Sequence, residues 1–331
     1  MKHLLVTGAA GFLGGRTAKA LAQRDQWSIL ATSRRTHRAG ELESHGCIFV
    51  PGDLCDASHC DVLTQHMNVV VHTAALSAPF GDYRGFHSSN VLATETLLAA
   101  CIRNGVSTFI YISTPSIYFN YGNRVNVKED DPLPDPMVNH YARTKYLAER
   151  HVLAHHGKGI ATIALRPRAI IGAEDTTIFP RILEAYHRGK LKIVGDGRNR
   201  CDFTCAANVI ESIECAIRAP ESAYGQAYNI TDGEAVDFWE ALNYALTSLG
   251  LEPPSQRVPK HLALCAAAFL EAYAKLTCSR KEPPLTRYGV GILANHFTLD
   301  ITRARTQLSY APIMSSYEGI NEYITWYKQS R

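Results

Sequence analysis

The stretch T-G-A-A-G-F-L-G at residues 7–14 places glycines at positions 8, 11 and 14. It follows the apolar run H-L-L-V-T (3–7), which reads as a β-strand, and it opens a helical pattern over 12–24. Glycine permits a tight turn and close approach of the backbone to a pyrophosphate. The following helix N-terminus offers free N–H groups and the positive end of its dipole. The stretch therefore predicts a dinucleotide site, in preference to a glycine-rich turn without a ligand.

The same alternation of strand and helix continues through the first half of the chain. Short apolar, β-rich runs at 28–32, 47–50, 68–72, 107–113 and 159–165 predict further strands, and the patterns at 89–104 and 138–156 predict helices. Continuous apolar strands that alternate with helices indicate a parallel sheet covered on both faces. The predicted fold is α/β, a Rossmann-type doubly wound parallel sheet with a smaller C-terminal substrate-binding region.

The regular alternation of predicted strands and helices ends after Pro167. Longer loops appear, Pro-Pro pairs occur at 253–254 and 283–284, and helices are predicted at about 205–218, 236–248 and 259–276. We therefore expect a dinucleotide-binding domain at 1–167 and a mainly substrate-binding region at 168–331. Between about 202 and 235 the chain is expected to return to the main sheet.

Composition excludes several classes of protein. The 331 residues are 46% hydrophobic and 20% charged, with a net charge of +3, which does not suggest a nucleic-acid-binding protein. No run is long and apolar enough for a spanning helix, so we expect no stable membrane insertion. The nine cysteines include no C-x-x-C pair, which is typical of reduced thiols in the cytoplasm. No metal site is expected, because the histidines lack partners at ligand spacing.

The second predicted strand ends in T-S-R-R, residues 32–35. An NAD site usually carries an acid here, which accepts a hydrogen bond from the ribose 2′-hydroxyl. This chain offers Ser33, Arg34 and Arg35 instead, and the planar guanidinium suits a 2′-phosphate. NADP(H) is therefore favoured over NAD(H) as the cofactor, with a solvent-facing basic loop as the alternative.

Residues 141–145 read Y-A-R-T-K, so Tyr141 and Lys145 lie one turn apart on one helical face. A tyrosine loses its proton near pH 10, and a nearby cation makes that loss easier. The pair is a candidate acid/base device, although taken alone an accidental surface pair is the simpler interpretation.

Several further stretches together carry a family resemblance. They are G-D-L (52–54), V-H-T-A-A (71–75), N-V-L-A-T (90–94), S-T-P-S-I-Y (113–118) and L-R-P-R-A-I-I-G (165–172). With the glycine turn and Y-A-R-T-K, the chain resembles the extended short-chain dehydrogenases/reductases over nearly its whole length. Among them it is similar to 3-beta-hydroxysteroid dehydrogenases, sterol-4-alpha-carboxylate dehydrogenases and 2-alkyl-3-oxoalkanoate reductases.

The resemblance implies a role for each matching residue. Tyr141 would be the proton donor or acceptor, and Lys145 would hold the nicotinamide ribose and lower the pKa of Tyr141. Thr114, with Ser113 as the alternative, would polarise the substrate oxygen. The implied cofactor contacts are Gly8, Ala10, Gly11, Phe12, Leu13, Gly14, Ser33, Arg34, Arg35, Asp53, Leu54, Thr73, Ala74, Ala75, Asn90, Ile112, Pro167 and Ile170, beside Tyr141 and Lys145. The implied substrate contacts are Ser77, Ser116, Tyr118 and Arg168.

The substrate class depends on two further stretches. In N-R-C-D-F-T-C-A-A-N-V (199–209), Cys201 precedes Asp202 where nucleotide-sugar enzymes tend to carry an arginine, although a shift by one residue would bring in Arg200. The largely apolar segment 258–276 predicts a lid over a long substrate, a surface that touches a membrane, or an ordinary packed helix. We therefore expect an NAD(P)-dependent oxidoreductase (1.1.1.-) that interconverts a ketone and a secondary alcohol on a small apolar substrate.

Two other functions stay open at this point. One is a nucleotide-sugar epimerase or dehydratase, and the other is a cofactor-binding regulator without turnover. The resemblance also implies a possible homodimer through the helices at 89–104 and 138–156.

Overall fold

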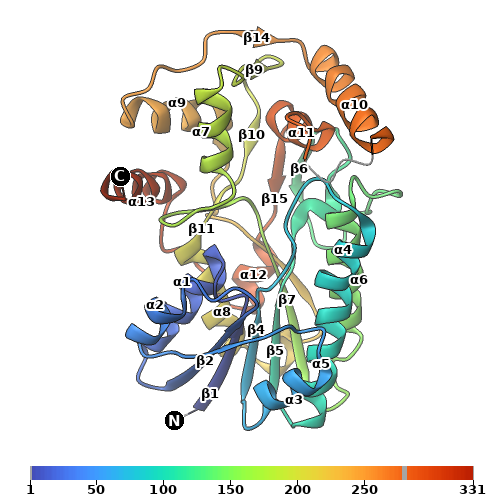
Figure 1. Cartoon of the computed structure of the whole chain (residues 1–331), viewed down its shortest axis with the longest axis vertical. Coiled ribbons are helices and arrows are strands. Elements are labelled where there is room, and N and C mark those ends of the chain that lie inside the picture. Colours follow the sequence, from blue (N-terminus) through green and yellow to red (C-terminus); the bar gives the residue numbers. More distant parts are fainter. Residues whose placement is uncertain (1, 278–281, 331) are drawn as a thin grey trace.

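A computed structural model describes residues 2–277 and 282–330 of the chain. Its centre is a seven-stranded parallel sheet in the order β12-β7-β5-β4-β1-β2-β3 (Figure 1). The strands are β1 (Lys2–Thr7), β2 (Trp27–Ser33), β3 (Ile48–Pro51), β4 (Val69–His72), β5 (Thr108–Ile112), β7 (Ala161–Pro167) and β12 (Ala227–Ile230). The predicted Rossmann-type sheet is confirmed. Its strand order reverses between β1 and β4, where ligands of such sheets bind.

Helices cover both faces of this sheet. One face carries α1 (Phe12–Ala22), α2 (Ala39–Ser44), α8 (Ala206–Ile217) and α12 (Thr302–Gln307); the other carries α3 (Ala57–Thr64), α5 (Ala93–Arg103) and α6 (His140–Leu153). The strand side chains alternate between the two cores, since Leu4 and Val6 join the first core and Leu5 joins the second. This two-sided burial explains why the strands are continuously apolar in sequence.

Two segments differ from the sequence-based elements. The predicted helix over 89–104 is preceded by α4 (Tyr83–His87) and begins as a π-helical turn, Ser88–Leu92, before α5. The seventh strand, β12, was not among the predicted strands, because its four residues A-Y-N-I include the polar Asn229 and form no continuous apolar run. It pairs with β7 and lies within the 202–235 segment.

Smaller elements lie mostly beyond the carboxyl ends of the main strands (Figure 1). The strands are β6 (Arg124–Val127), β8 (Ile170–Ile171), β9 (Ile193–Val194), β10 (Arg200–Cys201), β11 (Thr204–Cys205), β13 (Val236–Asp237), β14 (Arg257–Val258) and β15 (Phe297–Leu299). The helices are α7 (Phe179–His187), α9 (Phe238–Ser248), α10 (Lys260–Leu276), α11 (Arg287–Ala294) and α13 (Ser316–Gln329), with 3-10 turns at Pro115–Tyr118 and Glu221–Ala223. We call α7, α9, α10 and α11, together with the paired strands β9 and β14, the cap.

Candidate active site

The glycine turn joins β1 to α1 at the reversal point of the sheet. A Cβ atom on Gly8 would lie 2.8 Å from the Ala74 backbone, and one on Gly14 would lie 2.4 Å from the Gly8 carbonyl oxygen, so neither position admits a side chain. Gly8 also has φ +68°, which favours glycine. Gly11 caps α1 without a side-chain hydrogen bond, and the first turn contains no acidic residue. The first N–H groups of α1 therefore suit a pyrophosphate, and the turn fits a bound dinucleotide.

The end of β2 presents two arginines toward solvent. Arg34 and Arg35 are both exposed, and an Arg34 guanidinium nitrogen lies 3.9 Å from a carboxylate oxygen of Asp53. The structure thus brings together Arg34 and Asp53, which are both implied cofactor contacts. Arg38, which sequence reasoning did not single out, instead pairs with Glu41 and Glu174 and donates to the Gly11 carbonyl at 3.4 Å.

Tyr141 lies in the first turn of α6, at the carboxyl edge of the sheet. Burial raises the pKa of its hydroxyl, while side-chain hydrogen bonds with Thr114 and Ser77 lower the pKa and partly offset that rise. Thr114 follows β5 and begins the 3-10 turn Pro115–Tyr118. Within the described residues, the buried Ser113 hydroxyl has no hydrogen-bond partner. Of the two candidates for polarising the substrate oxygen, Thr114 is thus the one beside Tyr141.

Lys145 lies one turn beyond Tyr141 and is almost fully buried. Its Nζ donates a hydrogen bond to the Ile112 carbonyl at 2.5 Å and lies 4.0 Å from the centre of the Tyr111 ring. Burial lowers the pKa of Lys145 to about 7, against the opposing effect of the Glu149 carboxylate. That Lys145 lowers the pKa of Tyr141 stays a prediction, because Lys145 is not among the groups that shift this pKa here. Desolvation dominates the Tyr141 hydroxyl, and the Lys145 ammonium is turned toward Ile112.

A chain of hydroxyl groups extends from Thr114 to the cap. Thr114 donates to Ser116 Oγ at 3.0 Å, and that oxygen lies 2.7 Å from the hydroxyl of Tyr288 in α11. Tyr288 was missed by sequence reasoning, because 172 residues separate it from Ser116. The C-terminal half therefore contributes directly to the surroundings of Tyr141.

The remaining predicted cofactor contacts surround the same edge of the sheet. Thr73 donates to the Thr7 carbonyl at 2.6 Å, which fixes the end of β4 against the glycine turn. Asn90 is fully engaged with protein groups, since it bonds both the N–H and the carbonyl of Leu76 and the hydroxyl of Thr144. It thereby holds the segment that carries Ala74, Ala75 and Ser77. Ala10, Phe12 and Leu54 are buried, and Leu13 packs against the first core. Pro167 ends β7, and Ile170 begins β8.

The predicted substrate contacts separate into two groups. Ser77 and Ser116 belong to the hydroxyl cluster around Tyr141 and Thr114. Tyr118 does not, because it is 0% exposed and its hydroxyl bonds Asn229 and Arg166, so the expectation that it touches substrate is wrong. The Arg168 guanidinium lies 4.5 Å from the centre of the Phe297 ring. Its buried Nε has no hydrogen-bond partner in the described part of the chain, and its substrate contact stays a prediction.

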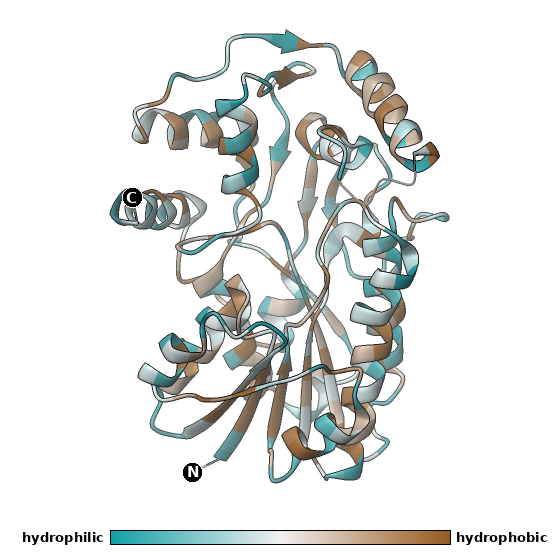
Figure 2. Cartoon of the chain, in the orientation of Figure 1, coloured by the Kyte–Doolittle hydropathy of each residue, from teal (hydrophilic) through white to brown (hydrophobic). Residues whose placement is uncertain are grey.

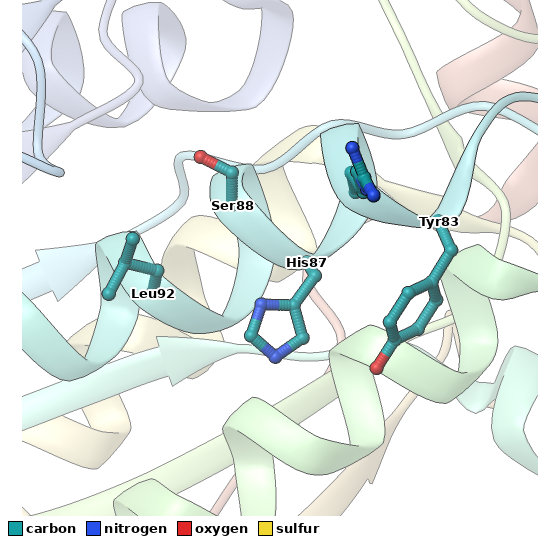
Figure 3. A pocket seen from close by; sticks show the side chains of 5 residues that line it. Tyr83, His87, Ser88 and Leu92 are labelled. Atoms are coloured by element: carbon teal, nitrogen blue, oxygen red, sulfur yellow. The ribbon is translucent and has the colours of Figure 1, made fainter.

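One surface depression has a volume of about 260 Å³. It is lined by Tyr83, Arg84, His87, Ser88 and Leu92 on α4 and the π-helical turn (Figure 3). None of these residues was predicted to bind cofactor or substrate. Of the lining residues, only Leu92 falls within the segments 89–104 and 138–156 for which the resemblance implied a possible dimer contact, and that contact stays a prediction.

The sequence profile of the NAD dependent epimerase/dehydratase family matches residues 4–231. The chain belongs to this family. It is 33% identical over 322 residues to the 2-alkyl-3-oxoalkanoate reductase of Stenotrophomonas maltophilia (strain K279a), covering 96% of this chain and 97% of the relative. It is 32% identical over 343 residues to the 3beta-hydroxysteroid-dehydrogenase/decarboxylase isoform 1 of Arabidopsis thaliana, covering 97% and 78% of the two chains. These relatives confirm the branch of extended short-chain dehydrogenases/reductases that the motifs indicated.

Solved structures of NAD dependent epimerase/dehydratase type share the fold. The UDP-glucuronic acid 4-epimerase of Bacillus cereus, solved in complex with NAD, superposes with a TM-score of 0.77 at 23% identity and covers 99% of both chains. At this identity the likeness concerns the fold alone. The family profile ends at residue 231, so it covers the glycine turn, Tyr141 and Lys145 but not α10 or α11.

Proposed function

We propose that this protein interconverts a ketone and a secondary alcohol on an apolar substrate, with NADP(H) preferred over NAD(H) and with Tyr141 as the acid/base group. The observation that carries this proposal is the hydroxyl of Tyr141, held by the side chains of Thr114 and Ser77 at the carboxyl edge of the sheet. Lys145 lies one turn away and the glycine turn lies at the same edge. These parts meet where a Rossmann-type sheet binds its ligands.

Reduction of a ketone requires a proton at the oxygen as negative charge develops there. A nicotinamide cofactor, when bound, would supply the hydride. Tyr141 then donates its proton to the oxygen, and the raised pKa keeps the hydroxyl protonated and ready to donate at neutral pH. Thr114 donates a second hydrogen bond to the same oxygen and stabilises its charge.

The charge of Lys145 is proposed to act on the hydroxyl of Tyr141, one helical turn away. Burial lowers the pKa of its ammonium to about 7, and the ammonium donates a hydrogen bond to the Ile112 carbonyl. The charged form stabilises a tyrosinate, which is the form of Tyr141 needed for oxidation. The bound nicotinamide ribose would lie within the reach of this ammonium, as the family resemblance implies.

Strand β10 and the residue that follows it support an apolar substrate over a nucleotide sugar. Arg200, the residue that a shift by one position would recruit for a diphosphate, is exposed and donates to the Ala235 carbonyl at 2.9 Å. Its neighbours Cys201 and Asp202 are buried, and Asp202 accepts from the Leu299 N–H at 2.6 Å. A diphosphate would need charge-assisted donors, and this segment directs its arginine elsewhere. The names of the relatives above, an oxoalkanoate reductase and a hydroxysteroid dehydrogenase, support the same substrate class.

The cofactor preference rests on the end of β2. Ser33 stands where an NAD site usually has an acid, and Arg34 and Arg35 are exposed at the same strand end, with Arg34 3.9 Å from an Asp53 carboxylate oxygen. Arg38 already pairs with Glu41 and Glu174, so Arg34 and Arg35 are the arginines proposed to bind the 2′-phosphate.

The test is a series of 3-oxoacyl compounds of increasing chain length, assayed by NADPH oxidation beside UDP- and GDP-sugars. Burial of one methylene is worth about 0.8 kcal/mol, so each added carbon should lower KM about threefold to fourfold until the pocket is filled. Turnover of a nucleotide sugar, or a KM that does not change with acyl chain length, would overturn the apolar-substrate proposal. Cofactor binding without turnover on any substrate would instead indicate the regulator.

A further inference from the structure

Helix α10 turns its apolar side away from the protein. Leu262, Phe269, Tyr273 and Leu276 are 55%, 72%, 61% and 84% exposed. They are spaced by seven, four and three residues, so they form one stripe along the helix. The exposed residues Cys265, Ala266 and Ala272 lie between them on the same face. Figure 2 shows this helix apolar over much of its length at the outer edge of the cap.

The inward side of α10 is small and partly polar. Its buried residues are Ala263, Ala267 and Ala274. Glu271 turns inward and pairs with Arg287 of α11 at 2.7 Å, and Lys260 donates to Asn295 at 2.5 Å. These contacts fix the rotation of the helix, so the apolar stripe cannot turn inward without breaking them. The large apolar side chains of the stripe therefore point to solvent and do not cover the proposed substrate site.

The dimensions of the stripe disfavour a second copy of the chain as its partner. A helix of 17 residues is about 25 Å long, and a face about 10 Å wide presents roughly 250 Å². A stable protein interface buries about 800 Å² on each partner. In the described part of the chain, no helix is long and apolar enough to cross a bilayer. A helix with an apolar outer stripe of this size instead suits the plane of a membrane interface.

The charges around the stripe are mainly basic. Lys275 lies on α10, and the paired strands β9 and β14 at the same end of the molecule carry Arg257 and are preceded by Lys190 and Lys192 (Figure 1). None of these four forms an ion pair with a described carboxylate. The acidic residues of this ribbon are Glu252 and Asp196. Basic side chains beside an inserted apolar stripe complement the head groups of anionic lipids.

We propose that α10 docks on the surface of a bilayer containing anionic lipids, with its stripe in the acyl boundary and the basic residues of the β9–β14 ribbon at the head groups. The inference goes beyond the proposed function and does not depend on it. Docking would place the cap against the phase in which apolar substrates concentrate.

The test uses the full chain and sedimentation with vesicles of phosphatidylglycerol and phosphatidylcholine, beside vesicles of phosphatidylcholine alone. We expect binding to the mixed vesicles, and at least a tenfold loss of binding in the double variant Phe269→Ser/Leu276→Ser. The matched control is Ile48→Ser/Val62→Ser, since these side chains are 60% and 62% exposed elsewhere on the surface. The control should bind as the parent does.

A second measurement separates insertion from simple adhesion. The fluorescence of a Phe269→Trp variant should shift to shorter wavelength with mixed vesicles and be quenched by brominated acyl chains. The Lys190→Gln/Lys192→Gln variant should bind about fivefold more weakly for each charge removed, with a smaller loss at high salt.

Three results would overturn the proposal. They are absence of binding to mixed vesicles, equal loss of binding in the control variant, and a dimer in light scattering that Phe269→Ser/Leu276→Ser converts to a monomer. Equal binding to neutral vesicles would overturn its electrostatic part. Because none of these measurements follows turnover, they are independent of the outcome of the substrate test.

Discussion

The main sheet and helix α10 are both rich in apolar residues, and the protein uses them in opposite ways. Leu4, Leu5 and Val6 of β1 are each 0% exposed, because helices cover both faces of the sheet. Phe269 and Leu276 of α10 are 72% and 84% exposed, although α10 has the more extended apolar pattern. The comparison teaches that an apolar period predicts an element and its preferred face, but not what that face packs against.

The two regions also differ in how they contribute to the site. The sheet side supplies Tyr141, Lys145 and Thr114 from segments close to strand ends. The cap supplies Tyr288, whose hydroxyl reaches Thr114 only through Ser116. The proposed reacting groups thus come from the sheet side, and the cap adds Tyr288, which lies beside Ser116 and close enough to Tyr141 to raise its pKa. The following variants test that division.

Replacement of Tyr141 by phenylalanine should have the largest effect. We expect the rate to fall about 10²–10⁴-fold with the fold and cofactor affinity unchanged, because the general acid is removed and the ring is kept. Steady-state rates and cofactor titration would measure both. Ser113→Ala is the matched control: it removes a nearby buried hydroxyl that has no partner among the described residues, and should change the rate by a few-fold at most. A Tyr141→Phe enzyme within a few-fold of the parent would remove Tyr141 from the acid role.

Arg34→Ala should have the next largest effect, and only on the cofactor. Loss of a charge-assisted bond to a 2′-phosphate should weaken NADPH binding about 10- to 100-fold and leave NADH binding nearly unchanged. Titration of both cofactors would measure this preference. Arg198→Ala, another exposed arginine but located in the loop before β10, should leave both affinities unchanged. Equal affinities of the parent for NADPH and NADH would mean that these arginines do not read the phosphate.

Tyr288→Phe should have the smallest effect, and it tests the link between cap and sheet. Loss of one hydrogen bond should lower kcat about twofold to tenfold, without weakening cofactor binding, because Ser116 no longer holds Thr114 in one orientation. Ser116→Ala should give a similar loss, and the double variant should lose little more, since both act through one chain of hydroxyls. Additive losses in the double variant, or a change confined to thermal stability, would show that Tyr288 is only a packing residue.

Much of the main sheet and its site could be predicted from sequence for local reasons. The glycine spacing after the first strand required a tight turn, and positions 141 and 145 share a helical face wherever the helix lies. The choice between Thr114 and Ser113 could not be made this way. Both follow β5, and only the packing of α6 decides which hydroxyl meets Tyr141. Tyr118 was assigned to substrate from its motif, but Arg166 and Asn229 hold it in the interior.

By itself, the sequence determined the parallel sheet, the dinucleotide turn and the Tyr141–Lys145 pair, because these depend on periods and short spacings within one segment. Only the tertiary structure decided the pKa directions. Burial raises the pKa of Tyr141, whereas a neighbouring cation alone would lower it, and burial lowers the pKa of Lys145 to about 7. It also decided the contribution of Tyr288 and the outward face of α10. Burial and long-range contact depend on how distant segments pack, and no local pattern encodes which side of a helix its neighbours will occupy.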